Sequence, residues 1–509
     1  MDPVRIRVFA IATGLVLAAS SAANAGPHDR LTWKGPGTCL SCHAREAREV
    51  HESSHYQWEG PAPYSVDGPL LQGKLRTAFN SYCINVTGNW SGCGNCHIGR
   101  GAVPGPSFIR TQAQNIDCLV CHQEQYRRRK VDGVFVPDTV AMSIPMDTAV
   151  QTVHLPTRAT CLQCHARGGG GDNYKRGDLA VAHTATTDRT FDVHMATTGA
   201  NMACQQCHTT VNHRIAGRGS DLRQTDLDVQ MTCSNPACHA TKAATSGHST
   251  AAIGRHVARV ACQTCHVGRS SARNALDTSA SEATEMHRDW AQPHVTASGA
   301  IHPLPTLVND IRPQYRFWNK YSANYSLGDA AFVDPATGRY PTSRPLGSID
   351  DLTAASKLYP FKYKTANQPI DLLRNILVPL DTSVYFATGD LARATSQGMV
   401  NMGHGAGDPW QMVTTDTFQL LTHEIAPRDR ALRCADCHGP TATQMSLPSL
   451  GYTLKAPAAT VCTQCHNNKT NPGWQSLHNK HVTDKRIECS MCHAFSRPER
   501  GLRIGITRD

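Results

Sequence analysis

Pairs of cysteines followed directly by histidine are the most frequent chemical pattern in this sequence of 509 residues. Nine stretches read Cys-x-x-Cys-His, and a tenth, from Cys233 to His239, has four residues between its cysteines. A chain with 21 cysteines could instead form a disulfide framework, and paired cysteines also bind zinc. Neither alternative requires a histidine after every pair, whereas c-type attachment of haem does. The pattern therefore predicts ten covalently attached haems c.

Each predicted site supplies two thiols for the vinyl groups of a haem and one histidine as the proximal iron ligand. The attachment cysteines are Cys39, Cys42, Cys93, Cys96, Cys118, Cys121, Cys161, Cys164, Cys204, Cys207, Cys233, Cys238, Cys262, Cys265, Cys434, Cys437, Cys462, Cys465, Cys489 and Cys492. The proximal histidines are His43, His97, His122, His165, His208, His239, His266, His438, His466 and His493. This assignment uses every cysteine except Cys83.

Histidines outside these motifs are numerous enough to act as second axial ligands. The chain has 26 histidines, so 16 remain after the ten proximal ligands are subtracted. A single extra histidine is more often a surface or core residue, but such an excess beside ten haems favours axial ligation. The nine predicted distal ligands are His55, His194, His213, His248, His256, His404, His423, His478 and His481. His51 could replace His55, and the reserve candidates are His28, His154, His183, His287, His294 and His302. One iron is left for a ligand other than histidine.

The unpaired Cys83 lies ten residues before the second attachment site. One interpretation is a small buried hydrophobic residue. The other is a reactive thiol, because a free cysteine is unusual in an exported protein.

The N-terminal stretch predicts export. Two arginines precede a short apolar run, and residues 23–25 read Ala-Asn-Ala, which is typical of a signal-peptidase site. We expect residues 1–25 to be a signal peptide, and the apolar run is too short for a membrane span.

The composition predicts that haems fill much of the core. Hydrophobic residues make up 40% of the chain and aromatic residues 6%, which is lean for this length. The net charge of +10 would be offset by haem propionates, so it indicates attraction of small anions rather than nucleic acid. Without sustained strand alternation, we expect a multihaem cytochrome c of mainly short α-helices and long loops around a stacked haem core, with little β-structure. Residues 271–430 lack attachment sites, and we expect them to form a covering layer with a helical stretch from Ile370 to Val378.

Several longer segments resemble one family. They read NSYCINVTGNWSGCGNCH, NIDCLVCH, PTRATCLQCHARGGGGDNYKRGDL, FDVHM, NHRIAGRG, VARVACQTCH and HEIAPRDRALRCADCHG. In this order they are similar to the octahaem tetrathionate reductase family of periplasmic cytochromes, over about residues 36–453. The domain prediction is therefore a reductase-like multihaem domain over 26–453 and a C-terminal extension with two further haems over 454–509.

The resemblance implies a periplasmic location and an active-site haem with a lysine ligand, a nearby aspartate and a cysteine. By motif these fall on Lys175, Asp172 and Cys83, beside the haem held by Cys93, Cys96 and His97. Without the resemblance, the better interpretation of Lys175 is an ordinary surface lysine in a glycine-rich turn. The chain departs from the family pattern in the longer Cys233 loop, in Arg176 where a histidine is expected, and in its two added haems.

The expected function is reduction of tetrathionate or another small sulfur or nitrogen oxyanion, with the remaining haems relaying electrons. A lysine ligand must be neutral to bind iron, and Asp172 could move protons while Cys83 exchanges with a sulfur chain. The alternatives are an electron-transfer wire without catalysis, or an enzyme of nitrite or hydroxylamine. We expect a redox protein or a quinol-oxidising cytochrome as the electron-transfer partner.

Overall fold

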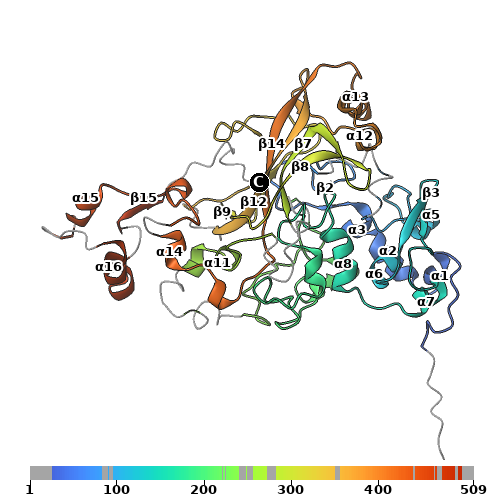
Figure 1. Ribbon diagram of the computed structural model, residues 1–509, viewed down its shortest axis with the longest axis horizontal. Coiled ribbons are helices and arrows are strands. Elements are labelled where there is room, and N and C mark those ends of the chain that lie inside the picture. The colour runs from blue at the N-terminus through green and yellow to red at the C-terminus, as the bar shows by residue number, and fades with distance from the viewer. Residues whose placement is uncertain are drawn as a thin grey trace, which may run out of the picture.

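A mixed β-sheet lies at the centre of the molecule in the computed structural model (Figure 1). The structure describes residues 26–82, 90, 94, 96–219, 222–223, 225–239, 248, 256–271, 283–349, 356–438, 442–463, 465–466, 473–487 and 491–495. The predicted signal peptide, Cys83, Cys93 and Cys489 lie outside these residues. No helix of the described part is long and apolar enough to cross a lipid bilayer.

The predicted fold class was wrong about β-structure, because the central sheet has eight strands. Its strand order is β10-β11-β14-β12-β7-β8, and β9 and β13 also pair with β12. Strands β12 and β14 run antiparallel from Phe361 opposite Leu420 to Asp371 opposite Trp410, whereas β12 and β7 are parallel. The strand bounds are β7 Thr284–Val295, β8 Ile301–Val308, β9 Gln314–Trp318, β10 Ser322–Asn324, β11 Tyr340–Pro345, β12 Lys357–Asp371, β13 Ile376–Leu377 and β14 Trp410–Leu420.

The buried positions of this sheet explain why the sequence pattern did not predict it. In β12 the side chains of Lys362, Lys364 and Gln368 are fully buried. Glu285 and Arg288 of β7 are buried as well. A strand whose inward positions are polar shows no apolar alternation, although its geometry still places alternate residues on one face. The helix expected from Ile370 to Val378 is also wrong, since β12 ends within it and β13 follows.

Short helices and hairpins of the N-terminal half lie on one side of the sheet, at the right of Figure 1. Their bounds are α1 Gly37–Leu40, α2 Ala44–His51, α3 Ser54–Gln57, β1 Glu59–Pro61, β2 Leu71–Gly73, α5 Arg110–Asn115, α6 Leu119–His122, β3 Arg128–Val131, β4 Val134–Pro137, α7 Met146–Gln151, α8 Arg158–His165, η1 Val181–Thr184, η2 Cys204–Gln206, β5 Thr210–Val211 and β6 Arg214–Ile215. Helix α11 Cys262–His266 lies instead at the left of the sheet in Figure 1. The expectation of short helices and long loops is therefore met in this part.

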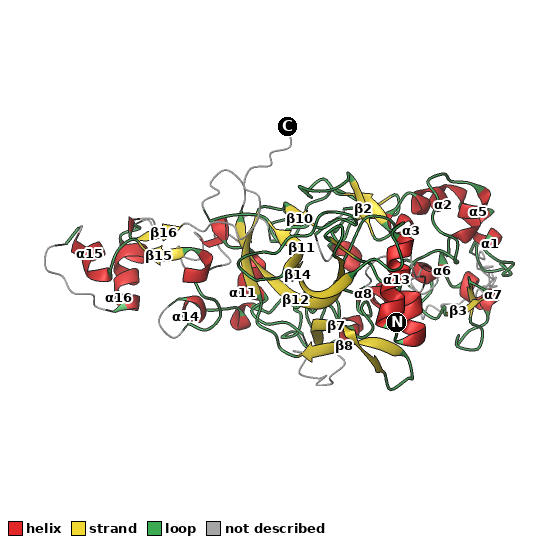
Figure 2. Ribbon diagram, turned by 90° about the horizontal axis from the view of Figure 1, so that it is seen from above, coloured by secondary structure: helices red, strands yellow, loops and turns green. Residues whose placement is uncertain are grey.

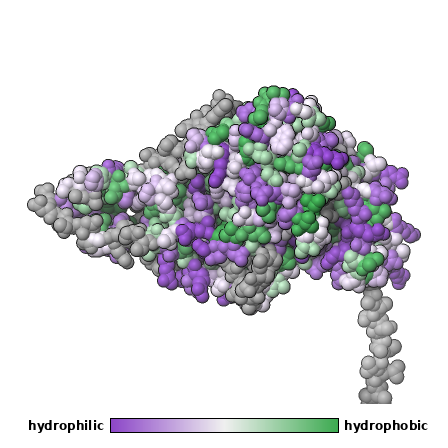
Figure 3. All heavy atoms as spheres, turned by 45° about the horizontal axis from the view of Figure 1, so that its top comes forward, coloured by the Kyte–Doolittle hydropathy of each residue, from purple (hydrophilic) through white to green (hydrophobic). Residues whose placement is uncertain are grey.

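The chain after the sheet forms an arm that projects on the opposite side (Figures 1 and 3). Its elements are α14 Cys434–Cys437, η5 Pro448–Leu450, β15 Tyr452–Leu454, α15 Ala458–Thr463, α16 Trp474–His478, the π-helix η6 Asn479–Asp484 and β16 His493–Phe495. Seen from above, the arm continues the long axis of the molecule away from the sheet (Figure 2). Helices α12 Thr382–Thr388 and α13 Leu391–Asn401 lie instead at the top of Figure 1, capped by Asp381 and Asp390.

Aromatic side chains join the sheet to the loops beside it. Phe361 of β12 is fully buried and packs with Leu222, Trp318 and Phe418. These residues come from three strands and one distant loop, so their packing fixes the loop against the sheet.

Truncating Phe361 tests this packing. We expect Phe361→Ala to lower the free energy of unfolding by about 3–5 kcal/mol, because it removes a buried ring and leaves a cavity. The measurement is chemical denaturation followed by circular dichroism. Leu373→Ala is the control, since Leu373 is 63% exposed and its truncation should change stability little. Equal effects of the two substitutions would contradict this packing.

Candidate functional site

Most of the attachment motifs lie on helices of one or two turns. Helix α8, for example, carries the Cys161 motif and begins at a reciprocal cap. The Thr157 hydroxyl accepts from Thr160 N, and the Thr160 hydroxyl accepts from Thr157 N at 3.0 Å. Cysteines three residues apart on such a helix project from the same face, which suits two bonds to one porphyrin.

The histidines of seven motifs face a second histidine from elsewhere in the chain. The distances between ring centroids range from 5.6 to 6.3 Å. The pairs are His28–His43, His55–His165, His194–His239, His208–His423, His256–His438, His466–His481 and His478–His493. Two facing imidazoles are the donor set of a six-coordinate haem iron, so these residues fit the predicted cofactor.

Backbone carbonyls orient several of these rings. Nδ1 of His208 lies 2.9 Å from the Ala216 carbonyl oxygen, and Nδ1 of His481 lies 2.9 Å from that of Leu477. A ring that donates its Nδ1 proton keeps the Nε2 lone pair available for a metal. In the His466–His481 pair the two Nε2 atoms are 3.4 Å apart. In this pair the two nitrogen atoms that could bind an iron therefore face each other.

Two further proximal histidines have less direct partners. Burial and the charge of nearby His213 lower the pKa of His122, and Nδ1 of His213 lies 2.8 Å from Glu49 Oε2. His266 is oriented by the Ala426 carbonyl at 3.0 Å. No ring contact joins His266 to the predicted ligand His248, whose sequence neighbours lie outside the described residues.

Six of the nine predicted distal histidines take part in these ring pairs, namely His55, His194, His256, His423, His478 and His481. His28, a reserve candidate, faces His43 of the first motif. His55 lies instead beside His165 of the fourth motif. His404 follows α13, and its ring meets no motif histidine within the described part of the chain. The structure thus brings His28 into the set of facing rings and leaves His404 outside it.

Thiols of different motifs lie close enough to hydrogen-bond, which shows how the attachment sites are arranged. Within the described part of the chain no two cysteines form a disulfide, in contrast to the disulfide framework considered from sequence. The neighbouring pairs are Cys39–Cys118, Cys96–Cys164, Cys161–Cys204 and Cys233–Cys262. The Cys161–Cys164 motif therefore borders the Cys96 motif and the Cys204 motif.

The glycine-rich loop that follows α8 passes over the Cys96 motif. Asn173 N donates to the Ala166 carbonyl at 2.8 Å, and the stem of Lys175 packs against Gly168 and Gly169. Gly169 has a φ of +92°, and a Cβ there would lie 3.0 Å from the ring of Tyr82. Only glycine fits this conformation and close approach without strain. The loop is therefore shaped by its sequence and is not merely flexible.

Both predicted active-site residues of this loop have defined positions. A hydrogen bond from Cys164 is the largest effect on the Cys96 thiol and lowers its pKa, and the charges of Lys74, Lys175 and Arg128 lower it further against the opposing effect of burial. Asp172 Oδ1 accepts from Val181 N at 2.8 Å, at the start of η1. Lys175 is thus one of three basic residues whose charge acts on Cys96, while Asp172 binds the backbone at the start of η1.

The proximal histidine of this site, His97, is turned toward the backbone. Its Nδ1 accepts from Gly99 N at 2.9 Å, so Nε2 carries the proton and donates to the Tyr56 carbonyl at 2.6 Å. The rings of Trp58 and Trp90 pack edge-on against it. Burial lowers the pKa of His97 to about 4. The imidazole is neutral at physiological pH, as an iron ligand must be, and Nε2 would have to leave Tyr56 to bind iron.

Two buried donors, Tyr82 and Lys362, bind the backbone of the glycine-rich loop from the side of the sheet. The Tyr82 hydroxyl lies 3.1 Å from the Tyr174 carbonyl and 3.3 Å from that of Lys175. Lys362 Nζ donates to the same two carbonyls at 2.8 and 3.1 Å. Burial and the charge of Lys364 lower the pKa of Lys362 well below its ordinary value. The backbone that bears Lys175 is therefore fixed by β12.

A buried ion cluster supports this contact. Glu285 Oε1 lies 2.9 Å from Lys364 Nζ, and Glu285 Oε2 lies 2.7 Å from Arg288 Nη2. Arg288 also donates to the carbonyls of Gly169 and Tyr82, and Lys364 Nζ lies 3.7 Å from the centre of the Tyr82 ring. Burial alone would raise the pKa of Glu285, but Lys364 and Arg288 outweigh it and lower the pKa to about 2. The cluster anchors both the glycine-rich loop and the residue directly before Cys83.

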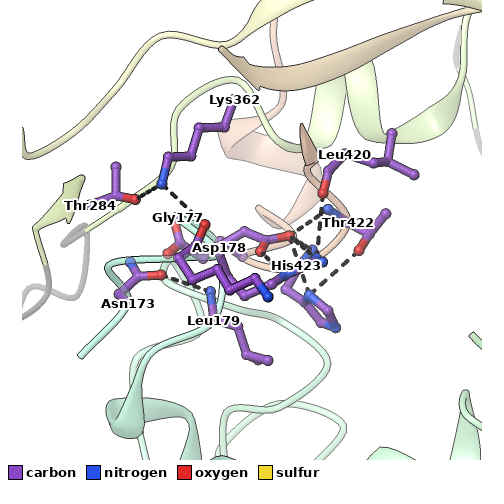
Figure 4. A network of polar contacts seen from close by, with 12 residues as sticks. Asn173, Gly177, Asp178, Leu179, Thr284, Lys362, Leu420, Thr422 and His423 are labelled. Carbon is purple, nitrogen blue, oxygen red and sulfur yellow. Dashed lines mark hydrogen bonds and ion pairs between the residues drawn. The ribbon is translucent and has the colours of Figure 1, made fainter. Parts of the chain in front are cut away.

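The end of the loop is tied to a different haem site (Figure 4). Asp178 is fully buried and accepts from Thr422 N at 2.7 Å and from His423 N at 3.1 Å. Its carboxylate also lies 3.3 Å from His423 Nδ1 and 3.1 Å from Arg176. Although burial opposes ionisation, Arg176 and His423 hold the pKa of Asp178 well below its ordinary value. Arg176, the residue that departs from the family pattern, thus neutralises the carboxylate that orients His423.

Sequence reasoning did not find the residues of the ion cluster. Lys362 and Lys364 lie about 190 positions beyond the loop that they support, and Glu285 lies about 110 positions beyond it. Their only signal is the alternation of two lysines with aromatic residues in FKYK, which also fits a solvent-exposed strand.

Comparisons with known proteins relate this chain to c-type cytochromes. Residues 306–441 match the family model described as cytochrome c, bacterial. The fold is similar to the crystal structure of an octahaem cytochrome c from Shewanella oneidensis, with a TM-score of 0.65 and 27% sequence identity, over 82% of this chain and 92% of that chain. An uncharacterized protein of Archaeoglobus fulgidus is 25% identical over 241 residues, which are 37% of this chain and 77% of the relative.

Neutralising Glu285 tests the ion cluster. We expect Glu285→Gln to cost about 3–5 kcal/mol of folding free energy, because it leaves buried cations without their counter-ion. The measurement is denaturation of the holoprotein followed by circular dichroism. The control is Glu52→Gln, since Glu52 pairs with Arg214 at 3.4 Å on the surface and should contribute less than about 1 kcal/mol.

The cluster also predicts a pH dependence with a definite sign. The pKa of Glu285 is lower in the folded than in the unfolded chain, so its stabilisation is complete above the unfolded value. It is lost as the pH falls from about 4 to about 2. Glu285→Gln should lose less stability over this interval than the wild type. An identical pH profile for the two proteins would contradict an ionised Glu285.

Proposed function

We propose that this protein, which is a multihaem c-type cytochrome, carries ten haems c and reduces tetrathionate or a related small oxyanion of sulfur or nitrogen. The proposed active site is the Cys93–Cys96–His97 attachment site, with Lys175 as the second axial ligand. The observation that carries this proposal is the glycine-rich loop that bears Lys175, whose backbone is held by the buried side chains of Tyr82 and Lys362.

The proposed ligands form a consistent set. Nine proximal histidines are assigned a histidine partner, with His28 taking the place that sequence reasoning gave to His404. His213 is assigned to His122 and His248 to His266. Lys175 is the residue that remains for His97. Histidine-paired sites are saturated and suit electron relay, whereas a lysine-ligated site suits chemistry because the amine can leave.

Lys175 has two proposed roles. Its amine must be neutral to bind a metal, so the site must depress its pKa. When the amine is displaced, it can take up a proton and attract the anion that replaces it. Cleavage of the central S–S bond of tetrathionate consumes a pair of electrons, which the haems supply, and yields two thiosulfates.

Asp172 and Cys83 are proposed to act beside it. Asp172 is a proton carrier for substrates such as nitrite, whose reduction consumes protons as well as electrons. Cys83 directly follows Tyr82, which the ion cluster fixes, so its thiol is proposed to exchange with a sulfur chain. Cys83 itself lies outside the described residues.

The remaining proposals concern location and partners. The predicted signal peptide supports a periplasmic protein, and an extracytoplasmic redox protein or a quinol-oxidising cytochrome is the proposed electron donor. The second candidate function is an electron-transfer wire in which Lys175 has no catalytic role. The C-terminal arm favours this alternative, because two added haems would lengthen an electron path.

Removing Lys175 tests the active site. We expect Lys175→Ala to change the ferric electron paramagnetic resonance spectrum and to abolish most dye-coupled tetrathionate reduction, because the site loses its ligand and an anion-attracting charge. Cys83→Ser should retain the spectrum and lose activity toward tetrathionate. Activities with nitrite and hydroxylamine, measured in parallel, identify the substrate class.

Lys74→Ala is the matched control, since the charge of Lys74 also acts on Cys96. We expect this variant to retain the wild-type haem spectrum. If Lys74→Ala changes the spectrum and Lys175→Ala does not, the ligand is assigned to the wrong lysine. If neither Lys175→Ala nor Cys83→Ser has an effect, the wire is the better account.

The haem count is tested by intact-protein mass spectrometry. The mass should exceed that of the chain by ten haem groups after removal of residues 1–25. The double variant Cys233→Ala, Cys238→Ala should lose one haem, because its longer motif is proposed to be loaded. A wild-type protein with nine haems, unchanged by this double substitution, would refute the tenth site.

A further inference from the structure

We infer that the last attachment site of the chain, Cys489–His493, is the junction between the sheet-bearing body and the Cys462–His466 site, which is the terminal electron port of the arm. Tyr452 is inferred to be the positioning residue at this junction. The order in space is thus the Cys434, Cys489 and Cys462 sites, which differs from the order in sequence. The inference goes beyond the proposed reductase activity and does not depend on it.

A small antiparallel sheet brings the last motif back to the body. Strand β16 pairs with β15, so that Leu454 lies opposite His493 and Tyr452 opposite Phe495. Lys455 N also donates to the Cys492 carbonyl at 3.0 Å. Strand β15 follows α14, which carries the Cys434 motif, after one 3₁₀ turn. The last motif is therefore attached next to the Cys434 motif, although it comes more than 50 residues later.

The ring of Tyr452 lies between the two proximal histidines. It stacks on His493 with a centroid distance of 4.3 Å and an interplanar angle of 27°. Its edge faces His438 at 6.5 Å and 69°. An aromatic ring in this position fixes the mutual orientation of the two imidazoles.

The Cys462 site is further from the body. Its helix α15 lies at the far left end of the molecule in Figure 1. In the described part of the arm the ring of His466 meets His481 and no histidine of the Cys434 site. The link to the body therefore runs through the last site.

One continuous helical segment connects the two arm sites. Helix α16 ends at His478 and continues directly as η6, which contains His481. The two histidines are three residues apart, one at the end of α16 and the other within η6. His478 faces His493, and His481 faces His466. The distal ligands of both arm sites are thus held in fixed positions relative to each other.

The test follows electron arrival at one site after injection at the opposite end. His481→Met gives the Cys462 site a thioether ligand, whose ferric charge-transfer band reports its oxidation state. A photosensitiser is attached through a non-natural amino acid at position 140, because Val140 is 93% exposed in the N-terminal half. The excited sensitiser supplies the electron, and each electron that arrives at the ferric site reduces it and bleaches the band. A sacrificial amine donor then reduces the oxidised sensitiser.

We expect removal of the junction with Cys489→Ser and Cys492→Ser to abolish the bleaching on the time scale of the parent. Tyr452→Leu should slow it, and Tyr452→Phe should preserve it, since the ring and not the hydroxyl is required. In the mirror experiment the reporter is His478→Met, and removal of the Cys462 site with Cys462→Ser and Cys465→Ser should leave its reduction rate unchanged.

The opposite pattern overturns the inference. If loss of the Cys462 site abolishes reduction of the His478→Met reporter, the arm follows the order of the sequence. If loss of the junction leaves the His481→Met reporter unaffected, the two sites connect to the body separately. The mirror experiment and the two tyrosine variants keep the test decisive even if removal of the junction disturbs the fold of the arm. Because the readout is electron arrival, its failure is distinct from an absence of reductase activity.

Discussion

The distance between facing imidazoles is the constraint on which the rest of this structure depends. Seven pairs hold their ring centroids within the narrow range from 5.6 to 6.3 Å, and backbone carbonyls or carboxylates orient several of the rings. Only 6% of the residues are aromatic, and several of them pack on the central sheet around Phe361. Short helices are sufficient for this arrangement of facing imidazoles, because each one only has to position two cysteines and a histidine.

The central sheet fixes the loop between the Cys161 and Cys204 motifs. Its inward face carries an ion cluster around Glu285, and Lys362 reaches the backbone on which Lys175 lies. A few residues further on, Asp178 holds His423, which faces His208 of another attachment site. One loop thus connects the proposed active site to a relay site through buried contacts.

The attachment motifs and most of the facing histidines could be predicted from the sequence, because covalent haem attachment requires a fixed local spacing. Partners that lie close together in the sequence could also be predicted from their spacing. His478 and His481, which lie between the last two motifs, are the example. The choice of His28 over His404 was not, since it depends on how the N-terminal segment folds back. The sheet was missed because charged side chains such as Lys364 occupy its buried positions, and only tertiary pairing makes such burial favourable.

The most direct test of the central claim is an experimental structure of the oxidised holoprotein, with the irons located by anomalous scattering. The account predicts ten irons, nine of them between two imidazoles, and one with His97 on one side and the Lys175 amine on the other. A histidine such as His404 on that iron, or a Lys175 side chain directed to solvent, would contradict it.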